Sequence, residues 1–302
     1  VSQKGQHSTQ HDRKEWGYTF RKKAHFMMCN RPQKAAEYRG RNPSRQACLW
    51  TSLWGLVLLF AGPATGQDYS AEIEAFFRRG HLDSAMMSSE AFVRAYPESA
   101  KAHGYLGTMY TESGRVGDAL GAFTRLTELQ PTSPTGYLNL AVLLTRGGKL
   151  PEAVGVLSRG LDRIPGSVPL LLQRGVLFGN AARVEEAEAD LEQAIALDPG
   201  NLEAYQNLAI ILTAAKAHDR ALAVSDRALA AMPNNPMVLV NRGGVLHAKG
   251  DLRGAFETYD RAIAAAPEDP QVHRALGFMA AEVGSLNVAR SAWERTIRLN
   301  GD

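Results

Sequence analysis

A proline recurs at a fixed interval of 34 residues over most of the chain, and this spacing constrains the fold more than any other feature. The six prolines are Pro97, Pro131, Pro165, Pro199, Pro233 and Pro267. Alanine keeps the same interval, at Ala85, Ala119, Ala153, Ala187, Ala221, Ala255 and Ala289. A period of roughly 20 to 50 residues is typical of proteins built from stacked copies of one small unit. We therefore expect an elongated array of repeats.

Within each period, apolar and small residues fall at the spacings of two amphipathic helices. We number each unit from 1 to 34, with the first unit starting at residue 66. Positions 4, 7, 8 and 11 then share one helical face, and positions 20, 24, 27 and 28 share another. Small residues at positions 8 and 20 predict a close crossing of the two helices, with larger side chains at positions 11 and 24 on its flanks. Seven such helix pairs are expected.

Unit 2 shows a motif that goes beyond the spacing. It has Leu106, Gly107 and Tyr110 at positions 7, 8 and 11, Ala119 and Phe123 at positions 20 and 24, and Pro131 at position 32. With this motif, residues 66–302 resemble the tetratricopeptide repeat (TPR) family, although His103 at position 4 departs from the Trp or Tyr that the family prefers. The resemblance implies an all-α fold, a right-handed α-solenoid of about seven TPR helix–turn–helix units. In that family, the first helices of the units line a concave groove.

Position 15 marks the turn inside each unit. Five units have Gly there, at Gly80, Gly114, Gly148, Gly250 and Gly284. Gly adopts positive φ without strain, so Ala182 and Lys216 at this position of units 4 and 5 predict turns that differ or are strained. The proline at position 32 disfavours a helical conformation for the residue before it, and we expect it to end the second helix.

The region before the repeats has the layout of an export signal. Residues 47–62 form an apolar run without charge, with basic residues before it and a small triplet at residues 64–66 after it. The nearest basic residues are Arg39, Arg41 and Arg45. This order is typical of a secretory signal peptide, here cut before Gln67. The alternative is an uncleaved membrane anchor, although a span needs about 20 predominantly apolar residues and this run is shorter.

These features divide the chain into three segments. Residues 1–26 are expected to be an upstream segment that is disordered or not translated, residues 27–66 the signal peptide, and residues 67–302 the TPR array. Residues 1–66 contain 11 Lys and Arg against 3 Asp and Glu, and the remainder contains 23 against 28. Because the array is mildly acidic, no nucleic-acid partner is expected. We expect an exported protein in the periplasm or cell envelope, with membrane contact only if the signal is uncleaved.

Motifs for catalysis, metals and cofactors are absent from residues 67–302. The phosphate-binding GxxxxGK(S/T), the zinc motif HExxH and the nucleophile turn GxSxG do not occur there. Cys29 and Cys48 both lie before residue 67, and the histidines of the repeats never pair at helical spacing. His103 and His273 at position 4 are expected to pack in the core. We therefore predict no enzyme activity, no metal site and no cofactor.

The face that lines the groove in TPR proteins carries a run of amides here. Position 6 reads Asn139, Gln173, Asn207 and Asn241 in units 3 to 6. A carboxamide both donates and accepts hydrogen bonds, so one amide per unit forms a ladder that can hold the backbone of an extended peptide. The alternative is that Asn is simply common at this position of the family. The family's carboxylate clamp of Lys, Arg and Asn is not reproduced, which argues against a chaperone C-terminus as the ligand.

Apolar residues flank the amides at positions 5 and 9. They are Leu138 and Leu172 at position 5, and Val142, Val176 and Ile210 at position 9. One interpretation is a hydrophobic stripe that binds a partly apolar polypeptide together with the amides. The other is ordinary packing between adjacent first helices, because aliphatic residues at regular spacing usually belong to a core.

We make predictions for two other surfaces. The acidic residues of the segment 185–192, among them Asp190, are expected to form the solvated face of the second helix of unit 4. Trp293 and Ile297 lie on the last helix, where no further unit follows them in the sequence. We expect this surface either to be tolerated or to associate, forming a homo-oligomer.

These patterns predict a noncatalytic scaffold whose partner, a protein or an extended peptide, binds in the groove. The alternative is a noncatalytic subunit of an envelope enzyme, pilus or secretion complex that docks a catalytic partner. A scaffold that binds peptides transiently is expected to purify alone, whereas such a subunit copurifies with one partner in a fixed ratio.

Overall fold

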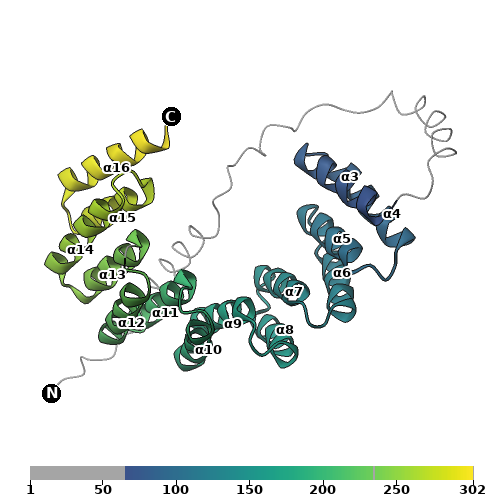
Figure 1. Ribbon diagram of the computed structural model, residues 1–302, viewed down its shortest axis with the longest axis horizontal. Coiled ribbons are helices and arrows are strands. Elements are labelled where there is room, and N and C mark those ends of the chain that lie inside the picture. Colours follow the sequence, from purple (N-terminus) through teal and green to yellow (C-terminus); the bar gives the residue numbers. More distant parts are fainter. Residues whose placement is uncertain (1–64, 234, 302) are drawn as a thin grey trace, which may run out of the picture. The chain divides into compact units, whose positions relative to one another are not determined.

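The computed structural model describes residues 65–233 and 235–301, which form fourteen α-helices and no strand (Figure 1). The first helices of the units are α3 Gly66–Arg78, α5 Ala100–Glu112, α7 Pro134–Arg146, α9 Val168–Asn180, α11 Leu202–Ala214, α13 Pro236–Lys249 and α15 Pro270–Glu282. The second helices are α4 Leu82–Ala95, α6 Val116–Leu129, α8 Leu150–Arg163, α10 Val184–Leu197, α12 His218–Ala231, α14 Leu252–Ala265 and α16 Leu286–Asn300. Helix starts recur every 34 residues, so the predicted all-α array of seven helix pairs is confirmed.

Local sequence explains where the helices begin and end. The residue before each first helix is a good helix cap: Thr65, Ser99, Ser133, Ser167, Asn201, Asn235 and Asp269. For example, Asn201 Oδ1 accepts a hydrogen bond from the backbone N–H of Ala204 at 3.1 Å. The second helices of units 1 to 6 end two residues before the proline of position 32, as α6 does at Leu129. The intervening residue leaves the helical conformation, with φ of −132° and ψ of 69° at Gln130, in agreement with the restriction that a following proline imposes.

The first described helix begins at the predicted cleavage site. The backbone N–H of Thr65 donates to Asp68 Oδ2 at 2.6 Å, and Thr65 Oγ1 accepts from the Asp68 N–H at 3.4 Å, which forms a capping box. Hydrogen bonds from the Thr65 side chain and backbone lower the pKa of the Asp68 carboxyl. A cut before Gln67 would remove this cap. The predicted apolar core at 47–62 and the upstream segment 1–26 lie outside the described residues.

The two helices of a unit cross closely, with one difference from the prediction. A Cβ atom on Gly107 would lie 2.6 Å from the ring of Phe123, and one on Gly277 would lie 2.4 Å from Trp293. Position 8 therefore makes room mainly for the side chain at position 24, rather than for the Ala at position 20. The large residue at position 24 is the one that packs over the backbone of the first helix.

The turns of units 4 and 5 are strained, as predicted. Ala182 and Lys216 have φ of 57° and 61°, in the left-handed region, and they are the non-glycine residues with positive φ in the described part of the chain. The glycine at the equivalent place in unit 3, Gly148, has φ of 74°. The same turn is thus kept at a backbone cost of about 1 to 2 kcal/mol for each residue with a Cβ.

Neighbouring units stack in chain order, with each second helix against the next first helix. From α7 to α15 the first helices also contact one another directly. Figure 1 shows α7 and α9 on one side of the stack and α8 and α10 on the other. A continuous buried cluster extends from Ala100 to Val245. The first helices α7 to α15 therefore form one connected surface.

Candidate functional site

The first-helix surface carries the four amides that the sequence predicted at position 6. Asn139, Gln173, Asn207 and Asn241 lie on α7, α9, α11 and α13, and each side chain is half-buried. Asn139 is engaged within its own helix, because its Nδ2 donates to the carbonyl of Thr135 at 2.9 Å. The amides of the other three have no hydrogen-bond partner in the part of the chain that the structure describes. These three groups are available to a ligand.

The predicted apolar residues flank the amides but differ in exposure. Leu172 is 8% exposed and belongs to the core. Leu138, Val142 and Val176 are half-buried. Ile210 is 36% exposed and is the most open of the five. Position 5 therefore contributes mainly to helix packing, and position 9 offers more surface to a ligand.

The ladder is interrupted at unit 2. Tyr105 occupies position 6 there, and its hydroxyl donates to Glu74 Oε1, at position 9 of the preceding unit, over 2.5 Å. Burial raises the pKa of Tyr105, and the hydrogen bond to Glu74 raises it further. In units 1 and 2, position 6 of the second unit therefore meets position 9 of the first. The amide run thus begins only at unit 3.

A small cavity lies at the amide surface between α11, α12 and α13. Gln206 and Asn241 border it, and Val238 lines it as well. Its volume is about 10 Å³, which leaves room for at most one water molecule. A ligand at this surface would therefore bind across the helices rather than enter a pocket.

One polar network in unit 4 was missed in the sequence. Arg174 on α9 donates to both carboxylate oxygens of Asp190 on α10 at 2.7 Å, and its Nη1 donates to Ser158 Oγ on α8 at 2.9 Å. The hydrogen bonding to Asp190 raises the pKa of the Arg174 guanidinium. Asp190 is 5% exposed. The prediction that it belongs to a solvated acidic face is therefore wrong, because its partner comes from another helix 16 residues earlier in the sequence.

Unit 6 repeats this arrangement with the partners exchanged. Arg242 on α13 donates to Asp226 Oδ1 on α12 at 2.9 Å and to Thr258 Oγ1 on α14 at 3.5 Å. In unit 4 the acid belongs to the same unit as the arginine, whereas here it belongs to the preceding unit. A signal for both networks was present in the sequence, because Arg174 and Arg242 occupy position 7, where units 2, 3, 5 and 7 have Leu.

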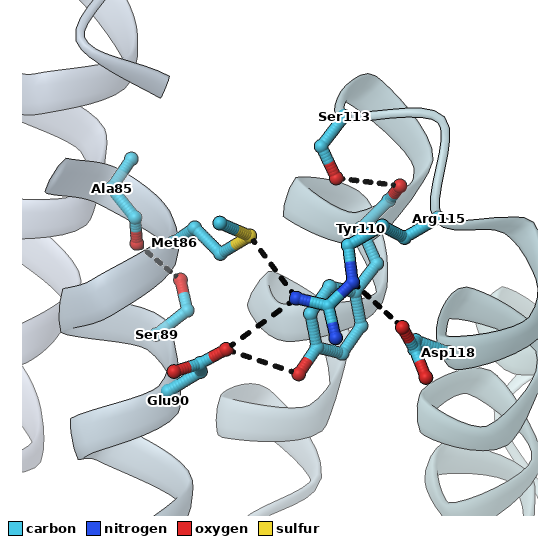
Figure 2. A network of polar contacts seen from close by, with 8 residues as sticks. All are labelled: Ala85, Met86, Ser89, Glu90, Tyr110, Ser113, Arg115 and Asp118. Carbon is cyan, nitrogen blue, oxygen red and sulfur yellow. Dashed lines mark hydrogen bonds and ion pairs between the residues drawn. The ribbon is translucent and has the colours of Figure 1, made fainter. Parts of the chain in front are cut away.

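Units 1 and 2 are joined by a third network (Figure 2). The guanidinium of Arg115 lies over the ring of Tyr110, 4.3 Å from its centroid, and its Nε donates to Asp118 Oδ2 at 2.7 Å. The hydroxyl of Tyr110 donates to Glu90 Oε1 on α4 at 3.2 Å. Burial of the hydroxyl and the nearby Glu90 carboxylate raise the pKa of Tyr110. These contacts hold unit 2 on unit 1 and do not involve the amide surface.

Of the two histidines at position 4 that were predicted to pack in the core, His273 is buried and His103 is only half-buried. Nε2 of His103 and of His273 each lies 2.8 Å from the carbonyl oxygen of the proline six residues earlier. Tyr137 makes the same contact through its hydroxyl at 3.2 Å. Among the residues that the structure describes, no group of His, Cys, Asp and Glu could hold a metal ion. Within the same ranges, no helix combines the length and the apolar character that a membrane crossing requires.

The predicted association surface lies on α16. Trp293 is 36% exposed and Ile297 is 54% exposed. The Trp293 ring packs edge-on against Phe278, with 5.9 Å between the ring centroids. Phe278 is itself 51% exposed, so this contact does not make Trp293 a core residue, and Ile297 is the more open of the two. Whether this surface forms a homo-oligomer stays a prediction.

Comparison with known families agrees with this geometry. Two family models described as tetratricopeptide repeat match residues 70–134 and 112–168, and residues 181–239 and 212–277. The chain belongs to the tetratricopeptide repeat family. TPR proteins are generally noncatalytic scaffolds for protein–protein interaction. No curated protein matches the sequence.

Two solved structures show the same fold. A tetratricopeptide repeat protein from Parabacteroides merdae has a TM-score of 0.58 and 18% identity, covering 78% of this chain and 94% of its own. PilW, described as a widely conserved type IV pilus biogenesis factor, has a TM-score of 0.55 and 17% identity, covering 71% of this chain and 100% of its own. At these identities the likeness concerns the fold alone.

Proposed function

We propose that this TPR protein is a noncatalytic scaffold that binds an extended, partly apolar polypeptide along the first helices of units 3 to 6. The observation that carries the proposal is the set of amides on Gln173, Asn207 and Asn241, which recur on adjacent helices and have no partner among the described residues. An extended peptide backbone offers one donor and one acceptor per residue, and a carboxamide matches both.

The neighbours of the amides suit a partly apolar ligand. The contact between Tyr105 and Glu74 pairs position 6 of one unit with position 9 of the preceding unit. By the same pairing we expect Gln173 to lie beside Val142, and the two following amides beside Val176 and Ile210. A ligand would therefore meet amide and aliphatic groups in turn. Backbone hydrogen bonds would supply part of the affinity, and burial of apolar side chains would supply the rest.

Replacing Gln173, Asn207 and Asn241 together by Ala tests the proposal. Ala preserves helix formation, so the helical circular dichroism should be unchanged. Loss of several hydrogen bonds should reduce the capture of polypeptides from extracts of the native host by about tenfold or more, measured by quantitative mass spectrometry. The matched control replaces Arg159, Asp260 and Arg261, exposed residues of second helices, by Ala. Undiminished capture by the groove variant, or an equal loss in both variants, would refute the proposal.

A second candidate function is a noncatalytic subunit that docks a catalytic partner in an envelope, pilus or secretion complex. PilW, a pilus biogenesis factor, supports this candidate only in sharing the fold. The two functions differ in the mass spectrum of captured material. A peptide-binding scaffold should yield many polypeptides at low occupancy, whereas a subunit should yield one protein in a fixed ratio.

We also propose that the array acts outside the cytoplasm. The support is the apolar run at residues 47–62 with basic residues before it. Sequencing of the N-terminus of protein isolated from the native host should give Gln67 as the first residue. An N-terminus before residue 47 on membrane-bound protein would favour the anchor instead.

A further inference from the structure

The side-chain pattern of the amide surface changes between units 6 and 7. Position 9 carries Val142, Val176 and Ile210 in units 3 to 5, whereas unit 6 has Gly244 there. Position 6, which carries an amide in units 3 to 6, is Ala275 in unit 7. Helices α13 and α15 contact each other, and by the pairing seen between units 1 and 2 we expect Gly244 to lie beside Ala275. These two positions therefore offer a ligand neither a branched aliphatic side chain nor an amide.

A tyrosine of the second helix of unit 6 lies under Gly244. Tyr259, at position 24 of α14, passes below the preceding glycine, because a Cβ atom on Gly243 would lie 2.9 Å from Tyr259 Cε2. A Cβ atom on Gly244 would lie 3.9 Å from Tyr259 Oη and, apart from the helix backbone and the adjacent residues, would meet nothing else within 4 Å. Ala275 packs against the same buried cluster as Tyr259. The tyrosine hydroxyl is thus the group that borders the open place on Gly244.

The Tyr259 hydroxyl is a donor without an acceptor in the described part of the chain. The residue is only 5% exposed, yet its hydroxyl makes no hydrogen bond with any residue that the structure describes. The buried Tyr137, by contrast, donates to the carbonyl of Pro131 at 3.2 Å. Burial, together with the nearby Glu282 carboxylate, raises the pKa of Tyr259 to about 12, so its hydroxyl stays protonated. Because buried polar groups are normally hydrogen-bonded, this donor indicates a place for an acceptor from outside the protein.

We propose that Gly244 and Tyr259 form a subsite of the groove that receives an asparagine or glutamine side chain of the bound polypeptide. This inference rests on the proposed function and adds to it a preference for one class of ligand residue. The carboxamide oxygen of the ligand accepts a hydrogen bond from the Tyr259 hydroxyl. The carbon atoms of the same side chain occupy the place that an aliphatic residue of position 9 fills in units 3 to 5.

The groups around this subsite favour a neutral ligand side chain with an acceptor. Glu282 on α15 is close enough to act on the Tyr259 hydroxyl, so it would repel a carboxylate of the ligand. Arg274 directly precedes Ala275 and would repel a lysine or arginine, and Glu282 already lies 3.6 Å from His247 Nδ1. An aliphatic side chain would cover the hydroxyl without giving it an acceptor, which is unfavourable. A carboxamide avoids all three penalties.

A phage-displayed library of random 12-residue peptides tests the proposal. The library is selected in parallel on the immobilised full chain and on its Gly244→Val and Tyr259→Phe variants. Gly244→Val gives unit 6 the residue that units 3 and 4 have at position 9, and Tyr259→Phe keeps the ring but removes the hydroxyl. We expect peptides selected on the original chain to carry Asn or Gln at one fixed position, about tenfold more often than peptides selected on either variant.

A labelled synthetic copy of one selected peptide gives the affinities, measured by fluorescence anisotropy. Tyr259→Phe should weaken its binding by about tenfold. Changing the Asn or Gln of the peptide to Leu should weaken binding to the original chain by a similar factor. The same change should have little effect on binding to the Tyr259→Phe protein, because the hydrogen bond is already absent there.

Two matched variants serve as controls. Gly121→Val lies on α6 at an exposed position where a Cβ atom would meet nothing within 4 Å, and it should leave peptide binding unchanged. Tyr137→Phe removes a hydroxyl that does have a partner in the protein, so it should lower the melting temperature without changing peptide binding. Tyr259→Phe should show the reverse pattern, with weaker binding and an unchanged melting temperature.

The outcomes separate the subsite from the groove as a whole. Peptides that bind the original chain and both variants equally, or a fixed position that prefers charged or aliphatic residues, would overturn the subsite and leave the proposed function standing. The Tyr259 hydroxyl would then be satisfied by solvent alone. If none of the proteins selects a peptide, polypeptide binding itself is refuted, and the subsite with it.

Discussion

Units 3 and 4 form the same helix pair, but unit 3 packs two apolar side chains where unit 4 pairs two charged ones. At positions 7 and 23, unit 3 buries Leu140 and Val156, each 6% exposed. At the same two positions, unit 4 has Arg174 and Asp190, joined by two hydrogen bonds of 2.7 Å. The helices of both units nevertheless begin and end at equivalent positions. The repeat thus fixes the backbone, and the chemistry between the helices can change as long as each buried polar group is paired.

Removing one member of the polar pair should have the largest effect. Arg174→Leu places the side chain of unit 3 in unit 4 but leaves the carboxylate of Asp190 buried without its partner. We expect a loss of about 3 kcal/mol in the free energy of unfolding, at the low end for buried ion pairs because Arg174 is partly exposed. Urea unfolding followed by circular dichroism measures it.

The control for this variant is Arg146→Leu, at the exposed end of α7. It also replaces an arginine of a first helix by leucine, but it leaves no buried acid unpaired, and we expect a change below about 0.5 kcal/mol. Equal effects of the two substitutions would show that the Asp190 pair contributes nothing particular to stability.

The turns of units 3 and 4 allow a test in which we expect an effect of intermediate size. Gly148 in unit 3 and Ala182 in unit 4 both have positive φ, and a Cβ on Gly148 would meet nothing within 4 Å. Gly148→Ala should therefore cost about 1 kcal/mol through the backbone alone, and Ala182→Gly should gain about 0.5 kcal/mol, because relief of strain is partly offset by a more flexible unfolded chain. Thermal unfolding gives both values.

The substitution Gly166→Ala is the control for Gly148→Ala and Ala182→Gly. It also has open space around its Cα but lacks positive φ, so Gly166→Ala should be neutral or slightly stabilising. If Gly148→Ala behaved in the same way, the left-handed turn would not limit the stability of unit 3.

The difference between units 3 and 4 also shows which structural features could be predicted from the sequence and which could not. The 34-residue period predicted the position of every helix pair, because the proline of position 32 and the cap of position 34 act locally on the backbone. The strain at Ala182 was predictable for the same reason. Asp190 was misassigned, since the acidic residues of α10 were considered on one helix alone. Its partner, Arg174, replaces the leucine of position 7, and that departure from the repeat was the available signal.

For the candidate site, too, the sequence predicted the surface on which the residues lie but not their individual contacts. The repeat set the amides on one surface, since position 6 always lies on the same side of a first helix. It did not indicate that Asn139 bonds to its own helix or that Leu172 is core while Ile210 is open. These distinctions depend on which side chains of the next unit cover a position, and neighbouring units differ in that respect.

A near-neutral effect is expected when both members of the pair are exchanged. The double variant Arg174→Leu with Asp190→Val gives unit 4 the residues of unit 3 at positions 7 and 23, and no buried charge remains. We expect its free energy of unfolding to lie within about 1 kcal/mol of the original, since well-packed apolar residues commonly replace buried ion pairs at no cost. The two single variants and the double variant form a cycle that isolates the coupling energy. A double variant as unstable as Arg174→Leu alone would mean that the space between α9 and α10 is shaped for the polar pair. A near-neutral result would instead show that the apolar pair of unit 3 fits between α9 and α10 equally well, so that the polar pair is not required for the stability of unit 4.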